Sequence, residues 1–249
     1  MWTNLYLDAA RLVLGPVLWF REWDHLVLSL LFRLFPHTDP RMNFAEFFIY
    51  NPLAGYWIFA AAFYFYWRLQ DQHTPQRRSS LLEIVFACVL GASVTLFLRP
   101  WLGAPSPARN PDFQGLFPRY LWGRGASNSF PSHATLIYLL IAAGIWPFSK
   151  RWSAALGAWV ILAISIPRIY MGGHYPTDIL CSIVFAFGFL WVAKRAGATR
   201  CGAEVLGRIA GGGQWTELIL FLWLFELAEG FRASFEIART LTNSIARIF

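Results

Sequence analysis

The stretch PRIYMGGHYPTD, residues 167–178, joins two long apolar runs and carries an arginine, a histidine and an aspartate. Arg168 closes the first run, while His174 and Asp178 stand four residues apart where the second run begins. Pro176 lies between them, and proline is favoured in the first turn of a helix. The stretch therefore predicts a polar turn between two apolar helices, with an imidazole and a carboxylate on one face of the second helix.

The composition is that of a membrane protein. Hydrophobic residues make up 57% of the 249 residues and charged residues only 14%, a balance that is unusual in soluble domains. The 13 tryptophans suit the two interfacial belts of a membrane. Crossing a bilayer takes roughly 20 apolar residues, and the runs that meet or approach this length are 47–67, 81–98, 133–148, 153–170 and 177–194.

The two ends of the chain are less regular. Residues 5–20 could cross a membrane only with Arg11 inside, and residues 24–35 look amphipathic, as an interfacial helix would. The aromatic run 215–231 fits either a further span or a surface helix. We expect an all-α, polytopic integral membrane helix bundle with about six transmembrane helices, a five-helix core plus terminal segments.

Three divisions of the chain follow from these runs. They are an N-terminal interfacial or membrane segment (1–46), a membrane core (47–195) with the loop 100–131 over one end, and a basic linker with a C-terminal apolar or amphipathic helix (196–249). Alternation of the five runs across the membrane brings the polar residues at their ends to one face, and these residues are Arg99, Ser132, His133, Arg168, His174 and Asp178.

Charge indicates which face this is. The turns on the opposite side carry Arg68, Arg77, Arg78, Lys150, Arg151, Lys194, Arg195 and Arg200, whereas the polar side carries Arg41, Arg99, Arg109, Arg119, Arg124 and Arg168. Cytoplasmic loops are enriched in lysine and arginine, so the polar cluster is predicted to face outward. The formal net charge is +7, but the basic residues are not gathered in one run. Nucleic acid is therefore not an expected partner.

The residue types of this cluster suit phosphoryl transfer. A carboxylate that orients an imidazole through one ring nitrogen leaves the other nitrogen free as a nucleophile or base, although His174 and Asp178 could also be an ordinary capping pair. Ser132 could cap a helix whose N-terminus favours phosphate, with His133 beside the anion, or the two could be a plain interfacial cap. Arg99 and Arg168 offer forked hydrogen bonds to phosphate oxygens. Considered alone, either arginine could instead extend its side chain along the apolar surface so that the guanidinium reaches the lipid headgroups.

Together these residues resemble the type 2 phosphatidic acid phosphatase superfamily of membrane lipid phosphatases over about residues 24–195. The family's third signature, Ser-Arg, five residues, His, three residues, Asp, stands here as PRIYMGGHYPTD, with Pro167 in place of the serine. The second signature, Pro-Ser-Gly-His, appears as Pro-Ser-His at 131–133. The first, Lys, six residues, Arg-Pro, keeps Arg99 and the proline after it but has Ala92 at the lysine position.

The resemblance implies a role for each residue. His174 would be the nucleophile that forms a phosphohistidine, with Asp178 orienting it and His133 protonating the leaving oxygen. Arg99, Arg168 and Ser132 would bind the phosphoryl oxygens. The departure in the first motif removes one cation, and Arg109, Arg119 or Arg124 could replace it. The missing residue in the second motif rotates the His133 side chain by about 100° around the helix axis unless Ser132 lies before the helix.

The resemblance is strongest to bacterial undecaprenyl-diphosphate phosphatases. It implies a metal-independent enzyme with no cofactor, in the bacterial inner membrane with its site facing the periplasm. Its partners would be a lipid phosphate and the membrane, and nucleic acid would not be a partner. The resemblance is compatible with a homo-oligomer. The alternatives are a phosphatidylglycerophosphate or phosphatidate phosphatase, a lipid phosphotransferase, and a non-catalytic phospholipid-binding membrane protein.

Overall fold

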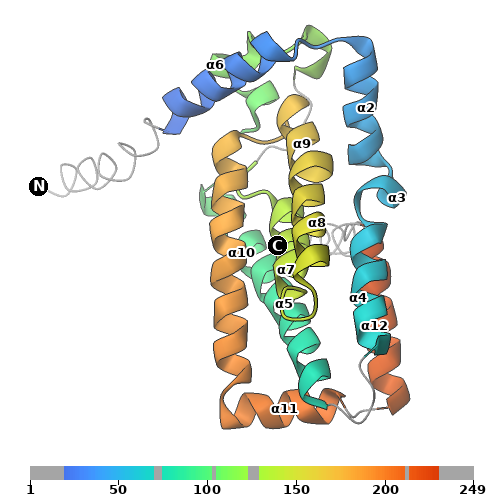
Figure 1. Cartoon of the computed structure of the whole chain (residues 1–249). Helices are drawn as coiled ribbons and strands as arrows, with labels where there is room; N and C mark the ends of the chain where they lie inside the picture. The colour runs from blue at the N-terminus through green and yellow to red at the C-terminus, as the bar shows by residue number, and fades with distance from the viewer. Residues whose placement is uncertain (1–19, 70–74, 103–104, 123–128, 211–212, 230–249) are drawn as a thin grey trace, which may run out of the picture.

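The protein is a bundle of helices (Figure 1). The computed structural model describes residues 20–69, 75–102, 105–122, 129–210 and 213–229, and these residues contain no strand. The predicted run 5–20 therefore lies almost wholly outside the described residues. The all-α fold class predicted from the sequence is confirmed.

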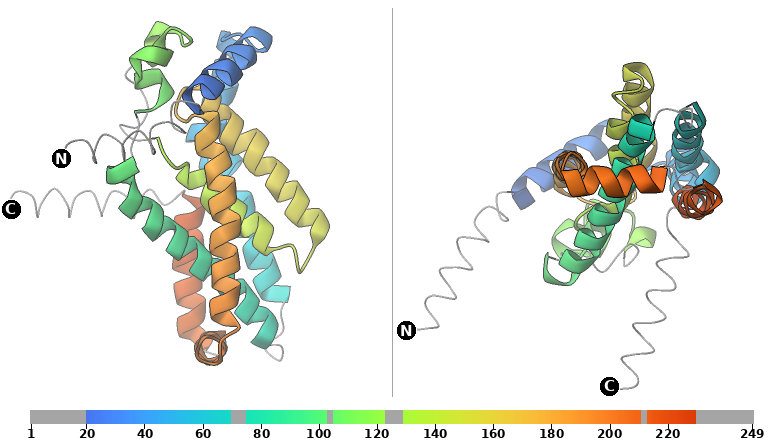
Figure 2. Two further views of the ribbon diagram at one scale, coloured as in Figure 1. Left: turned by 90° about the vertical axis from the view of Figure 1, so that its left-hand side faces the viewer. Right: turned by 90° about the horizontal axis from the view of Figure 1, so that it is seen from below.

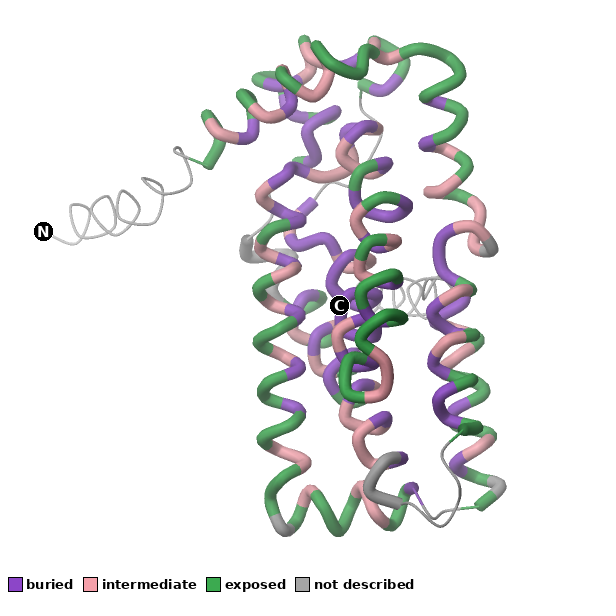
Figure 3. The backbone as a smooth tube through the Cα atoms, viewed as in Figure 1, coloured by how far each residue is buried: buried purple, intermediate pink, exposed green. Residues whose placement is uncertain are grey.

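A short, almost fully buried helix forms the centre of the bundle. This helix, α7 (His133–Gly144), is surrounded by α5 (Pro75–Leu102), α10 (Pro176–Gly197) and α8 (Lys150–Trp159), and Figure 3 shows the buried positions gathered along it. At 12 residues it is about 18 Å long, less than the ~30 Å of a bilayer core. Because its neighbours rather than lipid cover it, its irregular ends can be satisfied within the protein.

Three helices are long and apolar enough to cross a membrane among the residues that the structure describes. They cover Arg78–Phe97, Lys150–Tyr170 and Pro176–Gly197. Shorter apolar helices lie beside them: α7, α4 (Trp57–Leu69) and α12 (Gly213–Ala228), the last two packed on each other. The bundle expected from the sequence is thus built from three long helices and several shorter ones.

The single span predicted over residues 47–67 is wrong in its continuity. The structure divides it among α2 (Asp39–Tyr50), α3 (Pro52–Gly55) and α4. Pro52 disfavours helical conformation at the residue before it, and Asn51 is accordingly extended. The break places Tyr56 at a junction between two helices.

A π-helix interrupts the long helix that leads to Arg168. Helix α8 continues through η3 (Val160–Ser165), a π-helix, into α9 (Ile166–Tyr170). Pro167 lacks an N–H, and its ring would collide with the carbonyl four residues earlier in a regular α-helix. The wider π turn accommodates the proline without ending the helix, and such turns are frequent at functional sites.

The opposite ends of the bundle are closed differently. At the lower end, α11 (Arg200–Ala210) crosses from α10 towards α12 (Figure 2). At the upper end, a helix over residues 20–34 packs with α2, η1 (Pro107–Arg109), α6 (Pro111–Gln114) and η2 (Arg119–Leu121). A second hydrophobic core joins them, formed by Leu28, Met42, Ala45, Ala108, Phe113, Phe117, Leu121, Tyr170 and Tyr175.

Close contact between α5 and α7 gives a test of this packing. A methyl group at Gly144 would lie 2.4 Å from Cγ1 of Ile84, so we expect Gly144→Ala to lower the free energy of unfolding by about 1–3 kcal/mol. Gly157→Ala is the matched control, because no atom lies within 4 Å of the added methyl and alanine favours a helix. Thermal unfolding in detergent measures both, and a Gly144→Ala protein as stable as the Gly157→Ala protein would contradict this packing.

Candidate active site

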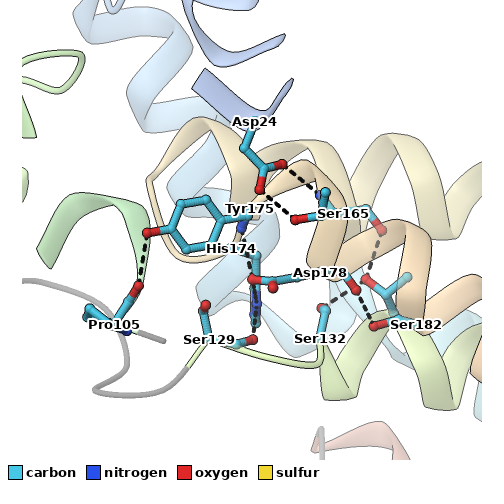
Figure 4. Close-up of polar contacts among 11 residues, drawn as sticks. Asp24, Pro105, Ser129, Ser132, Ser165, His174, Tyr175, Asp178 and Ser182 are labelled. Carbon is cyan, nitrogen blue, oxygen red and sulfur yellow. Dashed lines mark hydrogen bonds and ion pairs between the residues drawn. The ribbon is translucent and has the colours of Figure 1, made fainter. Parts of the chain in front are cut away.

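The predicted site residues lie at one end of the bundle. Helices α7 and α10 begin there, and α5 and α9 end there. Figure 4 shows His174 in the turn before α10, Asp178 in the first turn of α10, and Ser129 and Ser132 in the segment before α7 approaching one another. The alternation of helices, which the sequence predicts, produces this arrangement.

A backbone carbonyl, rather than a carboxylate, makes the short contact with His174. Its Nδ1 lies 2.8 Å from the carbonyl oxygen of Ser129 and 3.6 Å from Oδ2 of Asp178. Since a carbonyl oxygen can only accept, Nδ1 carries the hydrogen. The neutral imidazole then has its lone pair on Nε2, which is the state required of a nucleophile.

Asp178 has two functions in this geometry. Its Oδ2 accepts a hydrogen bond of 2.9 Å from the backbone N–H of Tyr175, closing a capping box at the start of α10. The same oxygen lies close enough to His174 to stabilise a positive charge on the imidazole. The two readings left open by the sequence, a capping pair and an oriented imidazole, are therefore compatible.

Ser132 does not cap α7 through its side chain, contrary to the prediction. Its hydroxyl is fully buried and lies 3.0 Å from Oγ1 of Thr135, which lies 2.9 Å from Oγ of Ser165. This chain of hydroxyls ties the start of α7 to the π-helix before Arg168. A hydroxyl in such a chain can turn its hydrogen towards an anion.

The shortened second motif is accommodated because Ser132 lies outside the helix. Its backbone is extended, and α7 begins at His133, so the missing residue does not rotate a helical position. Nδ1 of His133 lies 3.4 Å from Oγ1 of Thr95 on α5, a buried hydroxyl that itself donates to the Ala92 carbonyl. Helix α5 thus helps to orient the second histidine.

The two arginines differ in what the structure describes. Arg168 is half-buried at the end of the long helix; it donates from Nη1 to the carbonyl of Ile164 at 3.1 Å and from Nη2 to the hydroxyl of Tyr56. Arg99 lies in the last turn of α5, at the same end of the bundle, but its side chain is outside the described part of the chain. Arg124 is outside it altogether.

Segment 105–122 packs on the turn that carries His174. Gly172 has a φ of +69° and no room for a side chain, since a Cβ would lie 2.7 Å from that of Ala108. The Tyr175 hydroxyl receives a 2.9 Å hydrogen bond from Asn110 and donates to the Pro105 carbonyl at 3.1 Å. Burial raises the pKa of Tyr175 to about 12. These contacts hold the turn from the side of the upper hydrophobic core.

Sequence reasoning missed Asp24, which reaches the site from the N-terminal helix. Its carboxylate accepts from the backbone N–H of Thr177 at 2.9 Å and from the Thr177 hydroxyl at 2.5 Å. Asp24 is 3% exposed, so a charged residue in the polar stretch REWDH is in fact a buried second cap for α10. A buried partner contributed from 153 residues away leaves no local pattern.

Among the described residues, no group of three or more histidine, cysteine, aspartate or glutamate side chains could hold a metal ion. What the described geometry does offer is a histidine with its tautomer set, a second histidine, an arginine and a line of hydroxyls. These are the groups that phosphoryl transfer needs: a nucleophile, a proton donor and charge neutralisation.

Comparison with known proteins assigns part of the chain to a family. Residues 80–200, which carry His133, Arg168, His174 and Asp178, match the PAP2 superfamily. These residues form a PAP2 superfamily domain. The resemblance seen in the motifs is thereby confirmed, and the segments before residue 80 and after residue 200 flank the domain.

Two relatives match part of the chain, and the match to the first spans less than two thirds of that relative's own length. Over 140 residues the chain is 34% identical to the lipid A 4'-phosphatase of Bacteroides thetaiotaomicron, a match covering 53% of this chain and 61% of that protein. Over 160 residues it is 28% identical to YbjG of Escherichia coli K12, named provisionally as an undecaprenyl-diphosphatase, covering 63% of this chain and 75% of that protein. No solved structure gives a significant match.

Asp24 gives a pH-dependent test of the site's support. Burial raises the pKa of its carboxyl from 3.8 to about 6, despite the hydrogen bonds from Thr177. The folded protein thus holds this proton up to about pH 6, whereas the unfolded chain loses it near pH 4. The free energy of unfolding contributed by Asp24 should therefore fall as pH rises between these values and stay constant above them.

Asp24→Asn removes this titration, while its amide oxygen can still accept from Thr177. We expect the stability of the variant relative to the unmodified protein to increase from about pH 4 to pH 6 and then to level off. Thermal unfolding in detergent across this range measures it. A difference that does not change with pH would show that Asp24 titrates normally.

Proposed function

We propose that the protein is a membrane lipid phosphatase that acts through a phosphohistidine at His174. The observation that carries the proposal is the 2.8 Å contact between Nδ1 of His174 and the Ser129 carbonyl, which leaves Nε2 as the nucleophilic nitrogen. Membership of residues 80–200 in the PAP2 superfamily and the phosphatase names of both relatives support it.

In the first step, the Nε2 lone pair of His174 attacks phosphorus in line with the leaving oxygen. The phosphorus–oxygen bond breaks, and its electron pair stays on the leaving oxygen, which takes a proton from protonated His133. Arg168, with Arg99 from the end of α5, would neutralise charge on the remaining phosphoryl oxygens, and the Ser132 hydroxyl would donate a hydrogen bond to them. The products are the shortened lipid and a phosphohistidine.

In the second step, water attacks the phosphohistidine. His133, now neutral, accepts a proton from the water, and the phosphorus–nitrogen bond breaks with its electron pair returning to Nε2. Inorganic phosphate leaves and the starting protonation states are restored. Asp178, 3.6 Å from Nδ1, stabilises the positive charge that the imidazole carries while it is phosphorylated. Neither step requires a metal.

Undecaprenyl diphosphate is the proposed substrate. The second candidate is lipid A, a phosphorylated glucosamine lipid. The name of YbjG supports the first and that of the Bacteroides protein supports the second. The surplus of lysine and arginine on the opposite side of the membrane supports a site on the outer face of the cytoplasmic membrane. A lipid phosphate would reach the site there by lateral diffusion.

The nucleophile is tested by His174→Ala. We expect phosphate release from undecaprenyl diphosphate in EDTA to fall by at least a thousandfold, because the chemical step loses its nucleophile. His25→Ala is the matched control: His25 is exposed at the same end of the bundle and should retain full activity. Lipid A, phosphatidylglycerophosphate and phosphatidate assayed in parallel rank the substrates, and retained activity in His174→Ala would rule out the mechanism.

Asp178→Asn separates the charge of this residue from its capping role, because the amide oxygen can still accept from Tyr175. In enzymes where the carboxylate sets the histidine tautomer, this change costs about 10⁴-fold. Here the Ser129 carbonyl sets the tautomer, so we expect a smaller loss, about 10–100-fold in kcat. An unchanged kcat would reduce Asp178 to a cap, and a loss near 10⁴-fold would show that the Ser129 contact does not hold the tautomer.

A further inference from the structure

A line of contacts runs from Arg168 out of the PAP2 domain in both chain directions. Nη2 of Arg168 donates to the hydroxyl of Tyr56, which lies at the junction of α3 and α4, before the domain begins. The Tyr56 ring stacks on that of Tyr138, with ring centroids 4.9 Å apart and an angle of 7° between the planes. The Tyr138 hydroxyl donates to the carbonyl of Leu227 at 2.6 Å, beyond the end of the domain.

Each of these residues is held in place by burial. Tyr56 is 4% exposed, Tyr138 1% and Leu227 0%. Phe59 packs on the Tyr138 ring at a centroid distance of 4.8 Å, and the backbone N–H of Tyr56 donates to the Pro52 carbonyl at 2.8 Å. The line is therefore part of the packed interior and not a chance contact between flexible side chains.

The Leu227 carbonyl also has a reason to bind a hydroxyl. It belongs to the last turn of α12, which ends at Ala228, and the last four carbonyls of a helix have no intrahelical donor. A buried carbonyl without a donor would be costly, and Tyr138 supplies one. Helix α12 thereby fixes the rotation of the Tyr138 ring on which Tyr56 stacks.

We propose that Tyr56 is a positioning residue for phosphoryl binding: with Tyr138 and α12 behind it, it holds the Arg168 guanidinium where it can bind phosphoryl oxygens. The Ile164 carbonyl fixes Nη1 and Tyr56 fixes Nη2, so the remaining N–H groups of the planar guanidinium have a set direction. This inference rests on the proposed function. In this proposal, the segments that flank the PAP2 domain help to orient the Arg168 guanidinium.

The physical consequence is a specific dependence of anion binding on one hydroxyl. Without it, the guanidinium keeps its charge but rotates among several orientations, and ordering it again on binding costs part of the interaction. Tyr56→Phe removes only the hydroxyl and preserves the stack on Tyr138. Tyr66→Phe is the matched control, because Tyr66 is another buried tyrosine of this segment, on α4, that packs on Phe148.

The test is a double-mutant cycle with Arg168→Lys, which keeps the charge but loses the fork. We expect Tyr56→Phe to lower kcat/KM for phosphate release about tenfold in the unmodified chain and to have less than about twofold effect in the Arg168→Lys chain. Inhibition by vanadate, a phosphate analogue, should weaken by the same factors. Tyr66→Phe should change neither quantity, and thermal unfolding should show similar stability for both tyrosine variants.

Each outcome decides the proposal. Equal losses from Tyr56→Phe in both backgrounds would show that Tyr56 acts on stability or packing and not through Arg168, which overturns the proposal. If the unmodified chain releases no phosphate, the proposed function fails, and the cycle is read from the vanadate concentration that half-maximally raises the unfolding temperature. Coupling in that measurement supports the positioning role independently of catalysis, while no coupling or no vanadate binding overturns it.

Discussion

The hydrogen bond from Nδ1 of His174 to the Ser129 carbonyl organises the site. It joins the segment before α7 to the turn before α10, and these segments are 45 residues apart in the chain. It also decides which ring nitrogen carries the hydrogen, and so which one would attack phosphorus in the proposed mechanism. A backbone carbonyl cannot lose this function through ionisation, so the tautomer is insensitive to the charge state of the neighbouring carboxylate.

Around this bond, the structure uses three separate supports for one turn. Asp178 caps α10 from inside the helix, Asp24 caps it from the N-terminal helix, and the Tyr175 hydroxyl anchors it to the segment 105–122. All three contacts are buried or partly buried, where hydrogen bonds are electrostatically stronger than in water. The polar turn is therefore rigid although it lies between two apolar helices.

The sequence predicted the parts of the fold that depend on local pattern. Apolar runs gave the helices, and their alternation placed Ser132, His133, Arg168, His174 and Asp178 at one end of the bundle. The sequence did not predict the break in the run 47–67, because the apolar pattern continues through Asn51 and Pro52. Nor does it predict the π-helix, since in the sequence Pro167 differs from its surroundings only as a departure from a motif.

The contacts that complete the site could not have been predicted from local pattern. The Ser129 carbonyl is a backbone atom, and any residue type would supply it. Asp24, Tyr56 and Tyr138 act through partners far away in the sequence, so only the packing of the helices reveals them. The residues proposed to carry the chemistry are visible in the motifs, while those proposed to position them come largely from outside the motifs and partly from outside the PAP2 domain.

The most direct test of the central claim is to trap the phosphoenzyme. Purified protein would be mixed with undecaprenyl diphosphate or lipid A labelled with radioactive phosphorus, quenched in alkaline denaturant within the first turnover, and analysed for labelled protein. A phosphoramidate is stable in alkali and labile in acid, so we predict a label with this behaviour, on a peptide containing His174, and none in His174→Ala. Turnover of the same lipid without any labelled protein, or a label that survives His174→Ala, would contradict the account.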